Sequence, residues 1–132
     1  MIPRFRAWDV LAEKMIDEIL MISFVRKEII GKFSDGSTSV PLKFEDERNG
    51  EDVILMQSTG LRDKNGKEIF EGDVLTSQNY PAKGVVEFRT DSGMWVNCLK
   101  EYGYFEYLGN VASSRKIIGN IYENPELLED KE

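Results

Sequence analysis

The chain contains no histidine and a single cysteine, Cys98. Without an imidazole, neither a Ser-His-Asp nor a Cys-His catalytic set can be assembled within the chain, and histidine-containing zinc sites are excluded. One thiol can form neither an internal disulfide nor a thiolate cage, and this cysteine usage fits a reducing compartment. We therefore expect a protein that is not an enzyme and that holds neither a metal nor an organic cofactor.

Long apolar runs are lacking as well. The segment "EILMISFV" (residues 18–25) is too short to cross a bilayer. The opening "MIPRFRAWDV" does not show the cationic and then apolar layout of a signal peptide. We expect a cytoplasmic protein that does not interact with membranes.

Positive charge is scarce. Lysine and arginine number 17 against 24 acidic residues, so the net charge is −7. Because binding to a phosphate backbone requires local positive charge, we do not expect a nucleic-acid partner of the usual kind. The length of 132 residues, with 41% hydrophobic and 31% charged residues, indicates a soluble globular protein of one domain or two small lobes.

Short β-prone runs separated by turn dipeptides are abundant. Asp35-Gly36 between "EIIGKF" (28–33) and "TSVPLKF" (38–44) predicts a hairpin, and Pro41 predicts that its second strand lies at a sheet edge. The pattern predicts a mainly β fold with antiparallel strands and tight hairpins. Residues 1–55 should form a smaller β-rich lobe (or an α+β lobe), and residues 56–132 a small SH3-like, barrel-type lobe. The alternative is one continuous domain.

The stretch "TGLRDKNGKEIFEGDVL" (59–75) allows two hairpin registers. A two-residue turn at Asn65-Gly66 would oppose two lysines and two acids, which destabilises a strand pair. A type I turn over residues 63–66, with Gly66 left-handed as a bulge, instead opposes Asp63 to Lys67 and Arg62 to Glu68. We predict the second register, so the dense charge of this stretch is structural.

A second hairpin is predicted for "GVVEFRTDSGMWVNCL" (84–99). A bulged turn at residues 90–93 would pair Phe88 with Val96 and Val86 with Cys98 on one buried face. Arg89 would then lie beside Trp95 on the wetter face as a cation–π pair. Burial of Cys98 would make its thiol inert.

Aromatic residues gather in "EYGYFEYLG" (101–109), close in sequence to Trp95. Such rings can anchor a protein partner or stack on bases, although packing in the core or along strand edges explains them as well. The residues that we consider as a candidate binding surface are Arg89, Trp95, Tyr102 and Tyr104. Arg4, Arg6 and Trp8, which alternate along a predicted strand, form a weaker candidate whose simpler interpretation is an exposed strand face.

Carboxylates are the remaining potential metal ligands. Five of them occur between residues 45 and 52: Glu45, Asp46, Glu47, Glu51 and Asp52. Their spacing does not match a calcium-binding loop, and acids in a turn-rich connection are usually solvated. We predict no metal site.

Three segments resemble signature blocks of one protein family: "FRAWD" (5–9), "MQSTGLRDKNGKEIFEGDVL" (56–75) and "IIGNIYENPELL" (117–128). In this order they resemble the YopX family, which belongs to phages and prophages of Gram-positive bacteria. Residues 16–55 contain no such block. The resemblance implies a small phage-encoded protein with a β-rich fold and a barrel-like C-terminal part. It brings no established activity and no catalytic residues.

Together these observations predict a phage- or prophage-encoded accessory protein that acts through protein contacts in the cytoplasm of the bacterial host. Its partner would be a host protein, a phage protein or a second copy of the chain. The alternative from another class is a nucleic-acid-binding barrel that uses Arg89, Trp95 and the nearby tyrosines.

Overall fold

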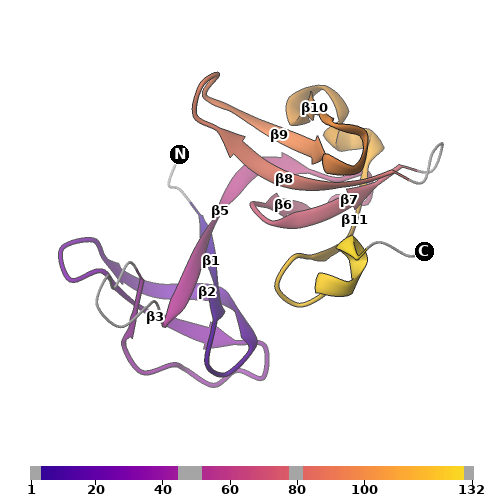
Figure 1. Cartoon of the computed structure of the whole chain (residues 1–132). Coiled ribbons are helices and arrows are strands. Elements are labelled where there is room, and N and C mark those ends of the chain that lie inside the picture. The colour runs from indigo at the N-terminus through magenta and orange to yellow at the C-terminus, as the bar shows by residue number, and fades with distance from the viewer. Residues whose placement is uncertain (1–3, 45–51, 78–81, 130–132) are drawn as a thin grey trace. The chain divides into compact units, whose positions relative to one another are not determined.

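The computed structural model describes residues 4–44, 52–77 and 82–129 (Figure 1). The described strand pairs are antiparallel, so the predicted mainly β class is confirmed. The chain divides into two compact units, Met1–Gln57 and Ser58–Glu132. No helix in the described part of the chain is long and apolar enough to cross a membrane.

Unit 1 is a strongly bulged antiparallel sheet in the order β4-β3-β2-β1-β5. Its strands are β1 (Phe5–Asp9), β2 (Lys14–Ser23), β3 (Glu28–Phe33), β4 (Leu42–Lys43) and the first half of β5 (Val53–Arg62). Apolar side chains of four of these strands meet on one face, and their burial stabilises the unit. The fully or nearly fully buried core consists of Ala7, Ile16, Ile29, Phe44 and Val53.

Unit 2 contains a five-stranded sheet in the order β10-β9-β8-β7-β11. The strands are β7 (Asp73–Thr76), β8 (Lys83–Arg89), β9 (Met94–Leu99), β10 (Tyr104–Tyr107) and β11 (Lys116–Asn120), and β6 (Glu68–Phe70) pairs with β5. Short helices join or follow them: η1 (Lys100–Tyr102), α1 (Leu108–Val111), η2 (Ala112–Ser114) and η3 (Pro125–Leu128). Within the described residues this sheet begins at β10 and ends at β11, so the predicted barrel is not closed.

The core of unit 2 lies on one face of this sheet. Leu75 and Val86 of the sheet pack against Ile69 of β6 and against Leu108 and Ala112 of the helical segment. Each of these five side chains is at most 5% exposed. The helical segment therefore covers the inner face of the sheet at the β8–β9–β10 end. The opposite face of those strands does not belong to this core.

The hairpin at residues 62–68 has the predicted register. Gly66 has a φ of 82°, its N–H donates to the carbonyl of Asp63 over 3.0 Å, and the N–H of Asp63 donates to the carbonyl of Lys67 over 2.8 Å. Arg62 lies opposite Glu68. The predicted bulged loop is thus confirmed. Of the two registers considered, it is the one that does not place like charges opposite each other.

The hairpin after β3 is confirmed in part. Gly36 has a φ of 90°, and the N–H of Phe33 donates to the carbonyl of Ser37. Of the predicted strand 38–44, however, only Leu42–Lys43 and an isolated bridge at Thr38 pair with β3. Pro41 directly precedes β4, and β4 is the terminal strand of its sheet, as the missing N–H of proline predicted.

The predicted register of the β8–β9 hairpin is wrong by one residue. Arg89 pairs with Met94 and Phe88 with Trp95, because the loop is a four-residue turn in which the N–H of Gly93 donates to the carbonyl of Arg89 over 2.8 Å. The shift places Val86 and Val96 on opposite faces, leaves Phe88 44% exposed, and turns Asn97 rather than Cys98 toward the core.

Candidate interaction surface

The outer face of strands β8, β9 and β10 presents a group of large side chains. Arg89 pairs with Met94, and Phe105 and Tyr107 pair with Cys98 and Val96 of β9. Because side chains alternate along a strand, this register places four of them on the same side, opposite Val86 and the core. We call this group the outer aromatic face: Arg89, Met94, Phe105 and Tyr107.

The side chains of the outer aromatic face contact one another closely. The guanidinium carbon of Arg89 lies 4.3 Å from the ring centroid of Phe105, a cation–π distance. The rings of Phe105 and Tyr107 are 5.6 Å apart and nearly perpendicular, at 80°. Met94 is 44% exposed and Tyr107 37% exposed. The face is therefore both ordered and open to solvent.

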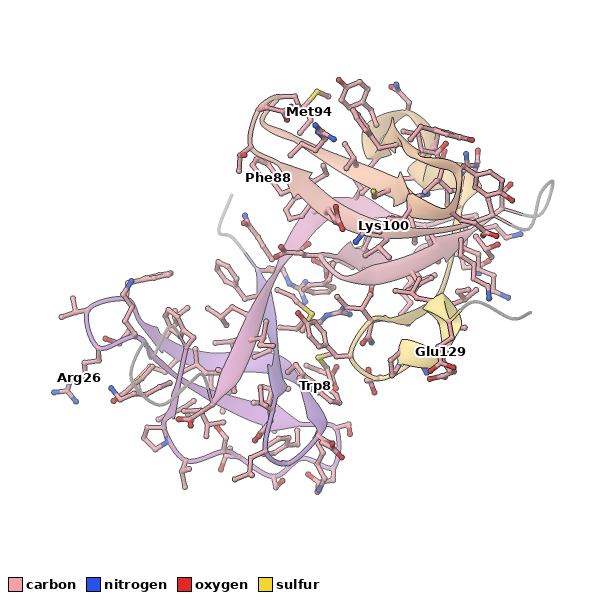
Figure 2. All side chains as sticks on the ribbon, in the orientation of Figure 1. Trp8, Arg26, Phe88, Met94, Lys100 and Glu129 are labelled. Atoms are coloured by element: carbon pink, nitrogen blue, oxygen red, sulfur yellow. The ribbon has the colours of Figure 1, made fainter. Side chains whose placement is uncertain are left out.

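Both cations at this face are paired with acids. Arg89 Nε and Nη2 donate to the two carboxylate oxygens of Asp91 over 3.1 and 3.0 Å, and Lys100 Nζ lies 3.1 Å from Glu87 Oε1. The hydrogen bond to Asp91 raises the pKa of Arg89, and the hydrogen bond to Glu87 raises the pKa of Lys100. The face thus presents an aromatic centre with neutralised charge at its rim. Figure 2 shows Met94 at the β8–β9 turn and Lys100 at the other end of β9.

Cys98 lies opposite Phe105 in the β9–β10 pairing, on the same face, and is half-buried. Burial raises the pKa of its thiol, and the neighbouring carboxylate of Glu87 raises it further. A raised pKa disfavours the thiolate, which is the nucleophilic form. Cys98 therefore contributes sulfur and apolar surface to the face rather than chemistry.

A buried ion pair behind the sheet fixes the orientation of β10. Glu106, between the two outer rings, turns inward, where Arg115 Nε and Nη2 donate to its carboxylate over 2.9 and 2.8 Å. Asn97 Nδ2 donates to the same carboxylate over 2.9 Å. Burial opposes ionisation of Glu106, but Arg115 and Asn97 outweigh it and lower the pKa of this carboxyl. With Glu106 held inward, Phe105 and Tyr107 must face outward.

The four predicted surface residues do not come together. Trp95 packs on the inner face against the core and makes a perpendicular contact with Phe88 at 5.1 Å. The cation–π partner of Arg89 is Phe105, so the predicted Arg89–Trp95 pair is wrong. Tyr102 and Tyr104 contact each other at 6.4 Å, at the start of β10 rather than on the outer aromatic face.

Sequence reasoning left Met94, Phe105 and Tyr107 out of the candidate surface. The side that Met94 faces depends on the β8–β9 register, and the side that Phe105 and Tyr107 face depends on the pairing of β10 with β9. The register follows from the number of residues in the β8–β9 loop, which is four. The β1–β2 and β2–β3 hairpins use the same four-residue turn, in which Glu13 and Lys27 take the left-handed position that Gly93 occupies here. Glycine at the fourth place of "TDSG" is therefore equally compatible with this longer turn.

The weaker candidates Arg4, Arg6 and Trp8 belong to unit 1. Arg4 is exposed, while Arg6 and Trp8 are half-buried in β1. Among the predicted solvated acids, Glu45, Asp46, Glu47 and Glu51 lie outside the described residues. Asp52 Oδ2 accepts the N–H of Lys43 over 2.8 Å. The described part of the chain contains no group of three or more acidic or thiol side chains placed to hold a metal ion.

The fold places this chain in the class of mainly β proteins. It has two units of antiparallel strands, and strand β5 runs through the boundary between them. Within that class the chain belongs to the YopX family, whose profile, described as YopX protein, matches residues 4–129. It is similar to the crystal structure of protein EF1440 from Enterococcus faecalis, at 28% identity and a TM-score of 0.63, covering 98% of this chain and 99% of that one. It is also similar to protein yopX from Bacillus subtilis, at 26% identity and a TM-score of 0.58, with 97% of each chain covered. A comparison with curated proteins gives no match.

Proposed function

We propose that this protein is a phage- or prophage-encoded accessory protein that has no enzymatic activity and binds a protein partner in the cytoplasm of the bacterial host. The outer aromatic face carries the proposal. Arginine, methionine, tyrosine and phenylalanine are the residue types enriched at the centre of protein interfaces. Here Arg89, Met94, Phe105 and Tyr107 lie together on one side of the sheet, with Met94 and Tyr107 exposed and Arg89 and Phe105 half-buried.

The charges at this face favour a protein partner over a nucleic acid. A phosphate backbone is bound by local positive charge, and each contact releases counterions. Arg89 and Lys100 are already paired with Asp91 and Glu87, so the face carries little net charge. Its paired rim instead matches an interface in which central aromatic anchors supply affinity and rim charges supply orientation.

The test compares what co-purifies from the host with the wild-type chain and with the variants Met94→Asp and Tyr107→Asp. Val25→Asp is the matched control, because Val25 is 95% exposed at the β2–β3 turn of unit 1. We expect a partner that is lost with both face variants and kept with the control. In the purified pair, Tyr107→Ala should weaken binding by about 1–2 kcal/mol. A partner retained equally by all variants would contradict the proposal.

A second arm of the experiment measures retention of single- and double-stranded DNA and RNA at physiological salt. We expect no measurable retention. If any such ligand were retained at micromolar concentration, lost with Arg89→Ala in a folded protein and weakened steeply by salt, the protein-binding function would be replaced by nucleic-acid binding.

A further inference from the structure

Strands β1 and β2 of unit 1 separate part of the way along their length. Their ladder runs from Asp9↔Lys14 to Ala7↔Ile16. Beyond it, a bulge lies between Ile16 and Glu18, and β2 continues against β3 up to Ser23. Phe5 and Arg6 of β1 follow β5 instead. Each strand is thus paired along one edge, while the edges that face each other diverge.

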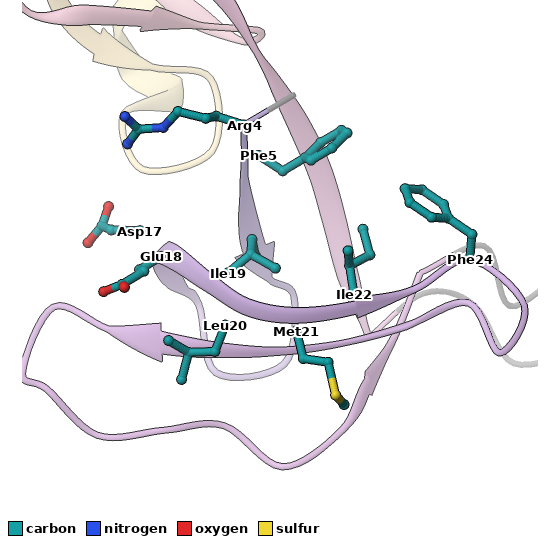
Figure 3. Close-up of a pocket in the computed structure, with 9 residues that line it drawn as sticks. All are labelled: Arg4, Phe5, Asp17, Glu18, Ile19, Leu20, Met21, Ile22 and Phe24. Atoms are coloured by element: carbon teal, nitrogen blue, oxygen red, sulfur yellow. The ribbon is translucent and has the colours of Figure 1, made fainter. Parts of the chain in front are cut away.

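A groove of about 660 Å³ opens where the two strands diverge, within the range of ligand sites. The start of β1 with the preceding Arg4, and β2 from Asp17 onward with the following Phe24, line it: Arg4, Phe5, Asp17, Glu18, Ile19, Leu20, Met21, Ile22 and Phe24. Figure 3 shows Phe5, Ile19, Ile22 and Phe24 on one side of β2, whereas Leu20 and Met21 point to the other side. The groove therefore has an apolar floor along one exposed strand edge.

The floor of the groove is an extension of the core of unit 1. Ile19 and Ile22 pack against the buried cluster that contains Ile16 and Ile29. At the far end Phe24 contacts the ring of Phe44 at 6.2 Å but remains 60% exposed. A large aromatic side chain held in place yet exposed at the end of a groove is suited to contact with an apolar ligand.

The other end of the groove is acidic. Asp17, Glu18 and Arg4 line it there, with two carboxylates and one guanidinium (Figure 3). A ligand that runs along the groove would meet apolar surface over its length and an excess of negative charge at one end. The distance from Glu18 to Phe24 along the strand is about 20 Å, the length of six extended residues.

We propose that this groove binds an extended segment of a partner protein, which adds as a strand to the edge of β2 at residues 18–22, where β2 pairs with β3 alone among the described strands. Main-chain hydrogen bonds would supply affinity, as in other cases of strand addition. Alternate apolar side chains of the segment would lie on Phe5, Ile19, Ile22 and Phe24, and a lysine or arginine would lie at the Asp17–Glu18 end. The site is built from residues of unit 1, and it does not depend on the function proposed for the outer aromatic face of unit 2.

The experiment uses the full chain and a displayed library of random heptapeptides as the probe. Peptides selected on the wild type should carry apolar residues at every second position and a basic residue at one end. Phe24→Asp should weaken the selected peptides about 10- to 100-fold in fluorescence polarisation. Val25→Asp should change affinity less than about twofold, because Val25 is 95% exposed and does not line the groove. Glu18→Lys should select peptides without the basic end.

Main-chain pairing is tested by N-methylation of alternate amides of a selected peptide. One peptide is methylated at its odd-numbered amides and a second at its even-numbered amides. We expect one of the two to lose binding and the other to keep it, because alternate amides of an added strand face β2. The proposal would be overturned if both methylated forms of a selected peptide kept binding, or if selected peptides bound Phe24→Asp and the wild type equally. A library that yields no binder would also overturn it, as would sedimentation showing that Phe24→Asp dissociates a dimer, since a second copy would then be the occupant.

Discussion

Replacement of Asp63 by asparagine tests how the turn of the β5–β6 hairpin is joined to the rest of unit 2. Asp63 is only 6% exposed. Its Oδ1 accepts the N–H groups of Asn65 and Lys67 over 2.9 Å each, and its Oδ2 accepts the N–H of Ile117 over 3.0 Å. The carboxylate thus closes its own turn and also holds the start of β11, 54 residues away.

The expected loss follows from these three hydrogen bonds. Asparagine keeps one oxygen, so either the two turn N–H groups or the N–H of Ile117 must face a side-chain NH₂ instead of an acceptor. A hydrogen bond to a charged group contributes about 1.5–3 kcal/mol, and an unsatisfied buried donor costs about 1–3 kcal/mol. We expect Asp63→Asn to lower the free energy of unfolding by about 2 kcal/mol.

The pH dependence gives this prediction a second measurement. Burial opposes ionisation of Asp63, but the N–H groups of Ile117, Lys67 and Asn65 outweigh it and lower the pKa of the carboxyl. A carboxyl whose pKa is lower in the folded state stabilises that state above its unfolded pKa of about 3.9. This contribution is lost as the pH falls through the folded-state pKa. The difference between wild type and variant should be constant from pH 5 to 8 and should shrink below about pH 4.

Urea denaturation at a series of pH values measures both quantities, and equal m-values would show that the unfolded states are comparable. Asp35→Asn is the matched control, because Asp35 Oδ1 also accepts a turn N–H, that of Ser37, but lies in an exposed loop. The control should leave the midpoint unchanged within error. A loss below about 0.5 kcal/mol for Asp63→Asn, or a loss that persists undiminished at pH 3, would refute this account of the turn.

Three further predictions concern packing, backbone strain and metals. A Cβ at Gly84 would lie 2.1 Å from Asn97 Oδ1, so Gly84→Ala should destabilise the protein by about 1–3 kcal/mol in urea denaturation, and Asn97→Ala should relieve part of that loss. Lys27 has a φ of 57°, and Lys27→Gly should raise the unfolding free energy by about 0.5–1 kcal/mol; a decrease would show that the turn is not strained. The melting temperature should not respond to millimolar Mg²⁺ or Ca²⁺; a rise that chelation reverses would revive a carboxylate metal site.

Local chemistry was sufficient to predict the turn of the β5–β6 hairpin, though not that of the β8–β9 hairpin. Asn65-Gly66 and the flanking charges specify one register because all the residues involved are neighbours in sequence. The second role of Asp63, as acceptor for Ile117, could not be predicted, since it depends on how β7 and β11 pair. A residue that appeared to be half of a surface ion pair is in fact a buried tertiary contact.

The groove of unit 1 was beyond prediction for a related reason. The pattern of β2 contains two bulges, after Ile16 and after Ile19, and each shifts the side-chain alternation by one residue. The sequence "MIDEILMIS" therefore shows no clean period of two, although it forms one long strand. Only the paired registers with β1 and β3 show which side chains face the groove.

The outer aromatic face depends on a buried polar contact that the sequence could not reveal. Hydrophobic alternation alone favours the register that buries Cys98, and a slip to it would move β9 side chains to the opposite faces of the sheet. The observed register buries Asn97 instead, at 1% exposure: Glu106 accepts from its Nδ2 and Gly84 leaves room for the side chain, while its Oδ1 has no hydrogen-bond partner among the described residues. In the other register Asn97 would face away from Glu106, which would lose this donor and keep those of Arg115. The Asn97–Glu106 hydrogen bond therefore accompanies the pairing that turns Met94 outward beside Arg89.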